Sequence, residues 1–189
     1  MNGATCTGGG RKEKMVEISV IERLITEHGR DIYSFCVYLT GDRTVADDLY
    51  QQTFLVAMEK GGIDETNNPK SYLLGIAVNI NNNRRRKEIR RQSKIGNADF
   101  DLAEEAYNVA ADQEPVEDEI YKRERNKAVR LEVLKLPDKL RDVVLLFYTE
   151  QLQVQEIAQV LKISEGTVKS RLHNARKILR ERLQKYADE

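Results

Sequence analysis

Residues Gln155 to Leu172 read Gln-Glu-Ile-Ala-Gln-Val-Leu-Lys-Ile-Ser-Glu-Gly-Thr-Val-Lys-Ser-Arg-Leu, and this stretch decides the fold of the C-terminal part of the chain. Ala158 is small at a point where two helices must approach closely, and Ser164 can cap the second helix. The pattern predicts two helices around a tight turn, Val154 to Leu161 and Glu165 to about Lys185. We therefore expect a helix-turn-helix. Its small core would be filled by Ile157, Leu161, Ile163 and Val168.

The second of these helices has one apolar and one polar side. At about 100° per residue, Val168, Leu172, Ala175 and Leu179 fall on one stripe, which we expect to be buried. The opposite side carries short hydrogen-bonding side chains flanked by cations, which suits base reading in a major groove and phosphate binding beside it. The alternative is an exposed basic face on an ordinary amphipathic helix. The residues predicted to contact duplex DNA are Thr167, Lys169, Ser170, Arg171, His173, Asn174, Arg176 and Lys177.

The rest of the chain also has helical periodicity. Between residues 15 and 148 apolar side chains recur three and four positions apart, with almost no strict alternation. We expect one helix to end near Gly29 and a second to end at Gly41. The fold class is therefore all-α. Further helices are predicted from a cap at Asp42 or Thr44 through Lys60, and from Asn68-Pro69 onward.

The charges of the chain are balanced but segregated. Lys plus Arg and Asp plus Glu each number 31, and a net charge of zero argues against a nucleic-acid partner only if the signs are mixed. Residues 84–94 hold seven cations against one acid, residues 95–119 hold nine acids and no cation, and residues 162–186 hold eight cations against two acids. The acidic block is too polar to bury a core, which predicts a solvated linker between two small helical domains.

The predicted domain organisation follows from these blocks. Residues 1–14 form a Gly-rich disordered tail, residues 15–94 the first domain, residues 95–115 the acidic linker and residues 116–189 the helix-turn-helix domain. The longest apolar run, Val143 to Tyr148, has six residues, far fewer than the roughly 18 of a transmembrane helix. We therefore expect no direct insertion into a membrane.

The cysteines and histidines form no recognisable chemical motif. Cys6 lies in the tail and Cys36 on an apolar helical face, which excludes a disulfide framework and fits a reducing cytoplasm. His173 is expected to face solvent, and His28 lies in the other domain. No phosphate loop, zinc spacing or Ser-His-Asp arrangement is present. We expect no cofactor, no metal and no enzymatic activity, although a nuclease using the linker carboxylates is an alternative.

Several motifs together resemble the extracytoplasmic-function (ECF) group of bacterial sigma factors, in the sigma-70 family. In the first domain, Ala46-Asp-Asp-Leu-Tyr-Gln-Gln-Thr-Phe54 is similar to the family's Ala-Glu-Asp-Leu-x-Gln-Glu-x-Phe segment. Ser71-Tyr-Leu-Leu-Gly-Ile-Ala-Val-Asn79 resembles its Ser-Trp-Leu-x-x-Ile-Ala-x-Asn segment. In the second domain the resemblance rests on Leu136-Pro137 and on Gly166-Thr-Val-Lys-Ser-Arg-Leu-His-x-Ala-Arg176. The chain departs from the family at Tyr72 (usually Trp), Gln52 (often Glu), Lys162 (usually Gly) and Asn83 (often Asp).

The resemblance implies three binding surfaces. The helix from Thr44 to Lys60 would dock on the clamp helices of the polymerase β′ subunit, and the helix-turn-helix would read the minus-35 element. The helix from Pro69 to Arg91 would engage the minus-10 element. Residues expected at the polymerase are Asp47, Asp48, Gln51 and Gln52, and those expected at the minus-10 element are Tyr72, Asn79, Asn82, Asn83, Arg84 and Arg85.

The resemblance also implies partners and a location. It predicts core RNA polymerase (β′ clamp helices and β flap), promoter DNA and a membrane-anchored anti-sigma factor as partners of a cytoplasmic protein. The linker would pass near the RNA exit path, where carboxylates can occupy a basic channel, although a merely solubilising linker predicts the same composition. A helix-turn-helix regulator that binds duplex DNA as a dimer is the alternative function, but it leaves the motifs of the first domain unexplained.

Overall fold

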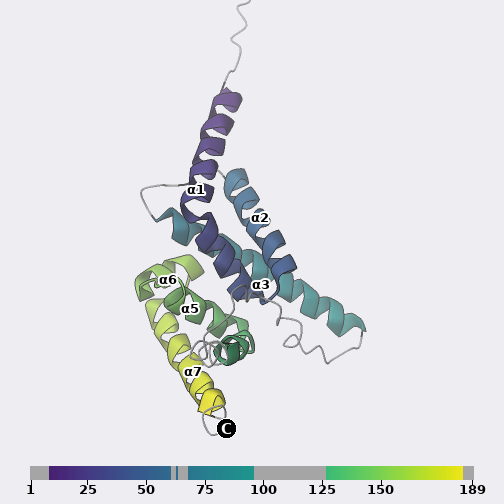
Figure 1. Cartoon of the computed structure of the whole chain (residues 1–189), viewed down its shortest axis with the longest axis vertical. Helices are drawn as coiled ribbons and strands as arrows, with labels where there is room; N and C mark the ends of the chain where they lie inside the picture. Colours follow the sequence, from purple (N-terminus) through teal and green to yellow (C-terminus); the bar gives the residue numbers. More distant parts are fainter. Residues whose placement is uncertain (1–8, 61–62, 64–67, 96–126, 185–189) are drawn as a thin grey trace, which may run out of the picture.

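A computed structural model describes residues 9–60, 63, 68–95 and 127–184. Those residues form helices and no strand (Figure 1). The helices of the first domain are α1 (Gly9–Thr40), α2 (Arg43–Lys60) and α3 (Pro69–Ile95). The second domain has a helix at residues 127–134, then α5 (Asp138–Tyr148), α6 (Val154–Leu161) and α7 (Glu165–Gln184). The predicted all-α fold is confirmed, and the acidic linker lies outside the described residues.

Helix α1 corrects the prediction of two helices separated at Gly29. It runs without a break from Gly9 to Thr40, and it includes Gly9–Lys14, which the sequence assigned to a disordered tail. Gly29 is needed for packing, because a Cβ at this position would lie 2.8 Å from the hydroxyl of Tyr50 on α2. The predicted end at Gly41 is confirmed, since Gly41 has a φ of 75° and its amide donates to the Val37 carbonyl at 2.9 Å.

The starts of α2 and α3 are fixed by side-chain caps. Of the two cap candidates for α2, Asp42 is the one used: its Oδ1 accepts from the Val45 amide at 2.8 Å. Asn68 caps α3 in the same way, with its Oδ1 3.1 Å from the Ser71 amide. Each cap satisfies an amide that has no partner within its helix, which typically contributes about 1 kcal/mol.

The core of the first domain lies where α1 crosses α2 and α3. Helix α1 contributes the fully buried Phe35, α2 contributes Phe54, and α3 contributes Leu73. Burying one such side chain stabilises the fold by about 1.5–3 kcal/mol. Their neighbours in this core include Leu24, Ile32, Leu39, Leu49, Ala57, Leu74 and Ala77.

The second domain contains the predicted helix-turn-helix with the predicted bounds of its first helix. Gln153 and Glu156 form a capping box at the start of α6, and Ser164 caps α7 by accepting from the Thr167 amide at 3.2 Å. Lys162 ends α6 in the left-handed conformation, with φ 53° and ψ 48°. On α7 the expected stripe is buried at Val168, Leu172 and Ala175 and half-buried at Leu179.

The two domains pack against each other. Helix α3 contacts α6, and α1 contacts α5 (Figure 1). One apolar cluster runs through both domains, joining Phe35 and Leu73 of the first to Leu146 and Ile157 of the second. The arrangement therefore brings the predicted minus-10 surface on α3 next to the second domain.

Lys162 gives a prediction about the turn. A Cβ in the left-handed region costs about 1 kcal/mol, so Lys162→Gly should raise the free energy of unfolding by up to about that amount. The exposed Gln159 on α6 supplies the control, because Gln159→Gly should lower the free energy of unfolding by about 1 kcal/mol. Urea unfolding measures both, and destabilisation by Lys162→Gly would contradict the assigned strain.

Candidate polymerase-binding and DNA-binding surfaces

The polar side of α7 is presented to solvent. Lys169, Ser170, His173, Asn174 and Lys177 are exposed there. Helix α7 packs mainly on α5 and α6, which belong to its own domain, so the contact between the domains leaves this side accessible. The structure thus gathers most of the residues predicted for duplex recognition on one free face of the helix.

Two residues of the predicted minus-35 set have a different position. Thr167 is half-buried, and its hydroxyl lies 2.8 Å from that of Ser164, so it belongs to the helix cap. Arg171 is half-buried, at the edge of this face. Sequence periodicity assigns these residues to sides of the helix but does not show which polar atoms the cap uses.

Arg176 is held in place by two aromatic residues of α5. Its Nε donates to the Tyr148 hydroxyl at 2.8 Å, and its guanidinium lies 5.6 Å from the ring centroid of Phe147 and 5.7 Å from that of Tyr148. A guanidinium fixed in this way loses less side-chain entropy when it binds an anion. This arrangement suits a phosphate contact at the flank of the recognition helix. The sequence identified Arg176 but not its aromatic support.

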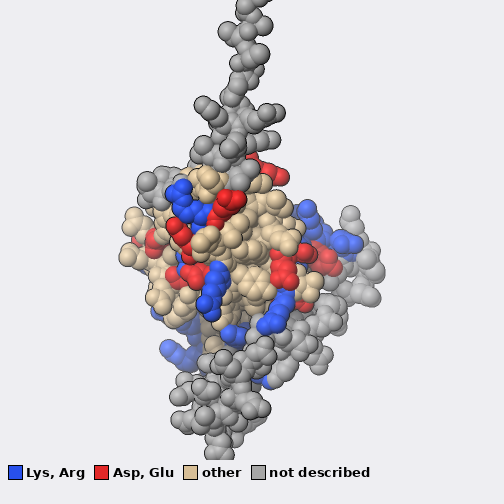
Figure 2. Space-filling model, turned by 45° about the horizontal axis from the view of Figure 1, so that its top comes forward, with Lys and Arg blue, Asp and Glu red and all other residues tan. Residues whose placement is uncertain are grey.

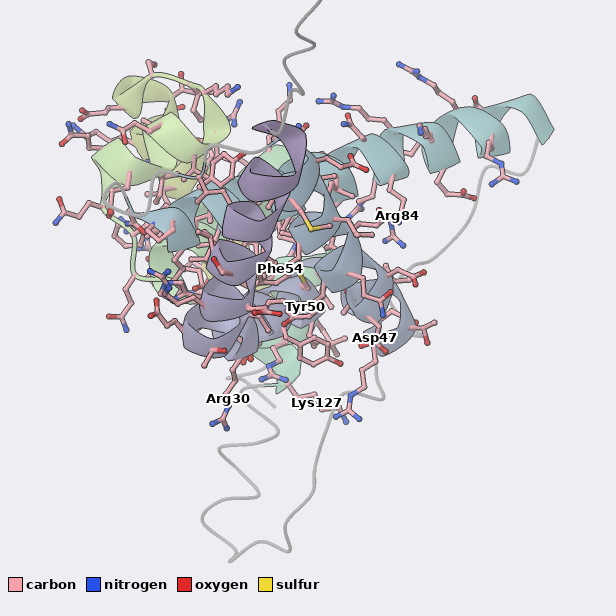
Figure 3. The ribbon with its side chains drawn as sticks, turned by 90° about the horizontal axis from the view of Figure 1, so that it is seen from above. Arg30, Asp47, Tyr50, Phe54, Arg84 and Lys127 are labelled. Atoms are coloured by element: carbon pink, nitrogen blue, oxygen red, sulfur yellow. The ribbon has the colours of Figure 1, made fainter. Side chains whose placement is uncertain are left out.

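A second surface lies on the exposed side of α2. Asp47, Asp48, Gln51 and Gln52 are all exposed, as the sequence predicted. Asp47 is hydrogen bonded by Tyr33 of α1, and this carboxylate raises the pKa of the Tyr33 phenol. Figure 3 shows Asp47 directed outward from α2, while Phe54 on the same helix points inward. The surface is acidic and polar, which suits a basic partner.

Leu55 adds an apolar residue to this surface that the sequence did not single out. Its side chain is 52% exposed, and it follows Asp48 and Gln52 at the spacing of one helical face. A leucine exposed beside charged residues is typical of a protein contact. The available sequence signal is the position of Leu55 on the side of α2 opposite Ala46 and Ala57, which are buried.

The third surface, on α3, is only partly free. Tyr72 is 38% exposed, Asn79 and Asn83 are exposed, and the Asn83 amide donates to Asn79 at 3.4 Å. Arg84 donates to the buried Asn81 at 3.5 Å. Lys and Arg gather at the right-hand edge of Figure 2, where Figure 1 places the C-terminal half of α3. These residues form an exposed polar and basic surface along α3.

Asn82 and Arg85 differ from their neighbours because the second domain contacts both. Asn82 Nδ2 donates to Asp142 Oδ2 at 2.7 Å, and Arg85 lies 3.0 Å from Asp138. Asp138 is shared with the buried Arg141, whose Nη2 lies 2.7 Å from the same oxygen. The structure therefore places acidic groups of α5 on two residues predicted to bind the minus-10 element.

Asp142 is almost completely buried at this contact. Burial raises its pKa to about 6, against the opposing effects of the Asn82 hydrogen bond and of the Arg141 and Arg85 charges. Asp142 Oδ1 and Asn82 Oδ1 both lack a hydrogen-bond partner when the carboxyl is ionised. Two buried oxygen atoms at this contact are therefore unpaired, which adds to the cost of burying the carboxyl.

Among the residues that the structure describes, no group of three or more His, Cys, Asp or Glu could hold a metal ion. In the same part of the chain no helix has the length and apolar character needed to cross a bilayer. The candidate surfaces therefore consist of protein side chains on α2, α3 and α7.

Comparison with known proteins matches each of the two domains to a family, in the order in which they occur along the chain. Residues 24–93 match the family Sigma-70 region 2, and residues 127–179 match the family Sigma-70, region 4. The ECF RNA polymerase sigma factor SigW of Bacillus subtilis is 31% identical over 80% of this chain and 82% of its own length. The chain belongs to the ECF group of the sigma-70 family. Its function is that of a sigma factor in transcription initiation, a regulatory subunit rather than a catalyst of its own reaction.

A further relative and one solved structure are also similar to this chain. The ECF sigma factor SigX of Bacillus subtilis is 26% identical, over 88% of this chain and 84% of that protein. A sigma factor RpoE, solved in complex with the anti-sigma factor NepR from Bartonella quintana, superposes with a TM-score of 0.70 and 20% identity. This match covers 86% of this chain and 96% of the solved chain, and it confirms the two-domain fold.

The raised pKa of Asp142 gives a prediction about pH. The folded pKa of about 6 lies above the ordinary 3.8, so the fold binds a proton that the unfolded chain has released between these values. The contribution of Asp142 to the free energy of unfolding is complete below about pH 4. It falls as pH rises to about 6, by at most about 1.4 kcal/mol per pH unit. Asp142→Asn should reduce that slope in urea unfolding at several pH values.

The control for this prediction is Glu59→Gln, on an exposed carboxyl of α2. This substitution should leave the pH dependence of the parent chain intact. If Asp142→Asn and the parent chain lose stability equally across this window, Asp142 does not carry the effect.

Proposed function

We propose that this sigma factor uses its three surfaces for three separate tasks. The α2 surface binds the β′ clamp helices of core RNA polymerase, the polar side of α7 reads the minus-35 element, and α3 engages the minus-10 element. The observation that carries the proposal is that family regions 2 and 4 occur in order and that each presents an exposed polar face suited to its task. The second domain also contacts the β flap.

The DNA-binding steps follow from the side chains on each surface. On α7, Ser170, Asn174 and Lys177 have the short or flexible donors that read base edges, while Arg176 is positioned at a flank for a phosphate. On α3, the amides of Asn79, Asn82 and Asn83 hold bases of the melted strand, and Tyr72 offers an aromatic face for stacking. Arg84 and Arg85 bind phosphates next to these amides.

The regulatory partner and location belong to the same proposal. The solved RpoE is in complex with the anti-sigma factor NepR, which supports an anti-sigma factor as a partner of this chain. We propose that this partner is anchored in the membrane and holds an otherwise cytoplasmic sigma factor inactive. The domain boundaries remain predictions: residue 94 lies near the end of α3, and residues 115 and 116 lie outside the described residues.

Transcription with purified core RNA polymerase on a promoter library tests the function directly. The chain should co-elute with core and generate transcripts that start at a defined set of promoters. Absence of both co-elution and promoter-dependent transcripts would contradict the proposal. A promoter found in this assay then supplies the DNA for the measurements below.

Reversal of a charge on the α2 surface should weaken the binding of this chain to core polymerase. Asp48→Lys places a cation against a basic partner, so co-elution with core should fall by about tenfold or more. Glu22→Lys reverses an exposed charge on α1 and should leave co-elution unchanged. The affinity of Asp48→Lys for a minus-35 duplex should also be unchanged, because this surface lies on the other domain.

Substitutions of two residues of α7 should weaken DNA binding in different ways. Ser170→Ala should change the preference at one or two minus-35 positions by about 1–3 kcal/mol, because it removes a base contact. Arg176→Ala should weaken binding evenly across sequences and lower the salt slope by about one, because it removes a phosphate contact. Fluorescence anisotropy with duplex variants distinguishes them, and an even loss for Ser170→Ala would rule out base reading.

A further inference from the structure

Tyr148, the last residue of α5, has an exposed side chain beside the recognition helix. It is 52% exposed, although α5 as a whole packs against α7 (Figure 1). Its ring meets the ring of Phe147 edge to face, with 5.0 Å between the centroids and 80° between the planes. Packing therefore fixes the direction of the Tyr148 ring and leaves its hydroxyl at the surface.

The hydroxyl of Tyr148 accepts one hydrogen bond and has a proton left to donate. Arg176 Nε donates to it at 2.8 Å. A phenol carries a single O–H, which cannot point at the N–H that its oxygen accepts. In the part of the chain that the structure describes, this O–H donates to no protein acceptor. The neighbouring guanidinium polarises the O–H bond and makes it a stronger donor, so Tyr148 offers this proton to a molecule outside the chain.

The donor lies at one edge of the face of α7 that is proposed to read DNA. Three exposed cations of α7, seven and four residues apart, follow the same edge: Lys169, Arg176 and Arg180. Cations at the edge of a helix in the major groove reach the sugar-phosphate backbone rather than the base edges. A donor beside Arg176 is therefore placed for a phosphate.

The carboxylates near this edge are already paired with lysines. Glu150 follows Tyr148 closely, but its side chain is 6% exposed and lies 3.0 Å from Lys70. Glu165 of α7 lies 3.7 Å from Lys169. The charge left over at the edge is therefore positive, which suits an anion.

We propose that Tyr148 and Arg176 form a clamp for one backbone phosphate of the minus-35 element, in which the Tyr148 O–H donates directly to a phosphate oxygen. The inference rests on the proposed function, which assigns α7 to this element and a phosphate to Arg176. The guanidinium supplies the charge through the N–H groups that Tyr148 does not use, and the phenol supplies a neutral donor. Tyrosine is among the side chains that bond phosphates in protein–DNA complexes.

The clamp joins two helices on one phosphate. Donors from α5 and from α7 meet there, so the phosphate fixes the position of the recognition helix along the groove as well as its distance from the backbone. Tyr148 thus adds affinity at every sequence. It also holds Ser170 and Lys177 in register with the bases that they are proposed to read.

Tyr148→Phe removes the hydroxyl and keeps the ring with its contacts to Phe147 and Arg176. Loss of a hydrogen bond to a charged acceptor should weaken binding of the minus-35 duplex by about fivefold, evenly across sequence variants. The salt slope should change by less than about 0.3, since no cation is removed, whereas Arg176→Ala lowers it by about one. Fluorescence anisotropy at several salt concentrations measures both. Unchanged affinity, or a loss confined to one or two base pairs, would overturn the proposal.

Tyr38→Phe is the matched control for removal of a phenol. The Tyr38 hydroxyl also accepts from an arginine, Arg130, at 2.6 Å, but it lies on α1 rather than beside α7. Its loss should leave the affinity for the minus-35 duplex within about twofold. An equal loss in Tyr38→Phe and Tyr148→Phe would contradict a contact that is specific to Tyr148.

The Arg176→Ala background separates direct donation by Tyr148 from support of Arg176. Tyr148→Phe should weaken binding by a further factor of about three in this background, because the phenol has its own bond to the phosphate. No further loss would overturn the proposal, since Tyr148 would then act only by holding the guanidinium.

Duplexes with a neutral methylphosphonate at one backbone position at a time locate the contact. The parent chain should lose affinity at one flanking phosphate, and Tyr148→Phe should lose less at that position because its hydrogen bond is already absent. Equal losses for both chains at every position would contradict the phosphate clamp. Absence of promoter-dependent transcripts for the unmodified chain would instead contradict the sigma function itself.

Discussion

The apolar cluster that joins Phe35 and Leu73 to Leu146 and Ile157 is the interaction on which the arrangement of the two domains depends. At its edge lies the hydrogen bond between Asn82 on α3 and Asp142 on α5. A buried carboxyl with a single amide donor stabilises a contact only weakly. The carboxylate must lose its hydrating water, and one of its oxygens has no hydrogen-bond partner. An apolar pair at the same place would hold the domains more firmly. A polar pair can instead separate into water with both partners solvated. The contact is therefore specific in register and still reversible.

The local elements could be predicted from the sequence because their signals are local. Asp42, Asn68 and Ser164 cap the helices that the sequence assigned to them, and the bounds of α6 agree with the prediction. The prediction of a helix end at Gly29 was wrong, because a glycine that ends a helix and a glycine that makes room for a neighbouring side chain look the same in the sequence. Only the position of Tyr50 in the structure shows that Gly29 is of the second kind. The closing of one domain on the other could not be predicted, since Asp138 and Asp142 read as the polar side of a short amphipathic helix.

The balanced charge of the chain has a structural meaning that composition does not reveal. Basic residues of α3 and α7 form the surfaces proposed to bind DNA, and acidic residues of α5 pair with α3 of the first domain. The pair of Arg85 with Asp138 is half-exposed, so salt weakens it. The contact between the domains therefore weakens at this edge as ionic strength rises.

Protonation acts on the same edge of the contact through Asp142. Asp142 faces Asn82 and Arg85 from α3 and Arg141 and Asp138 from its own helix, and burial among them raises its pKa to about 6. Where opening admits water to this carboxyl, its pKa falls toward the ordinary value, so opening releases a proton and closing binds one. A lower pH therefore favours the arrangement in which the two domains are packed together.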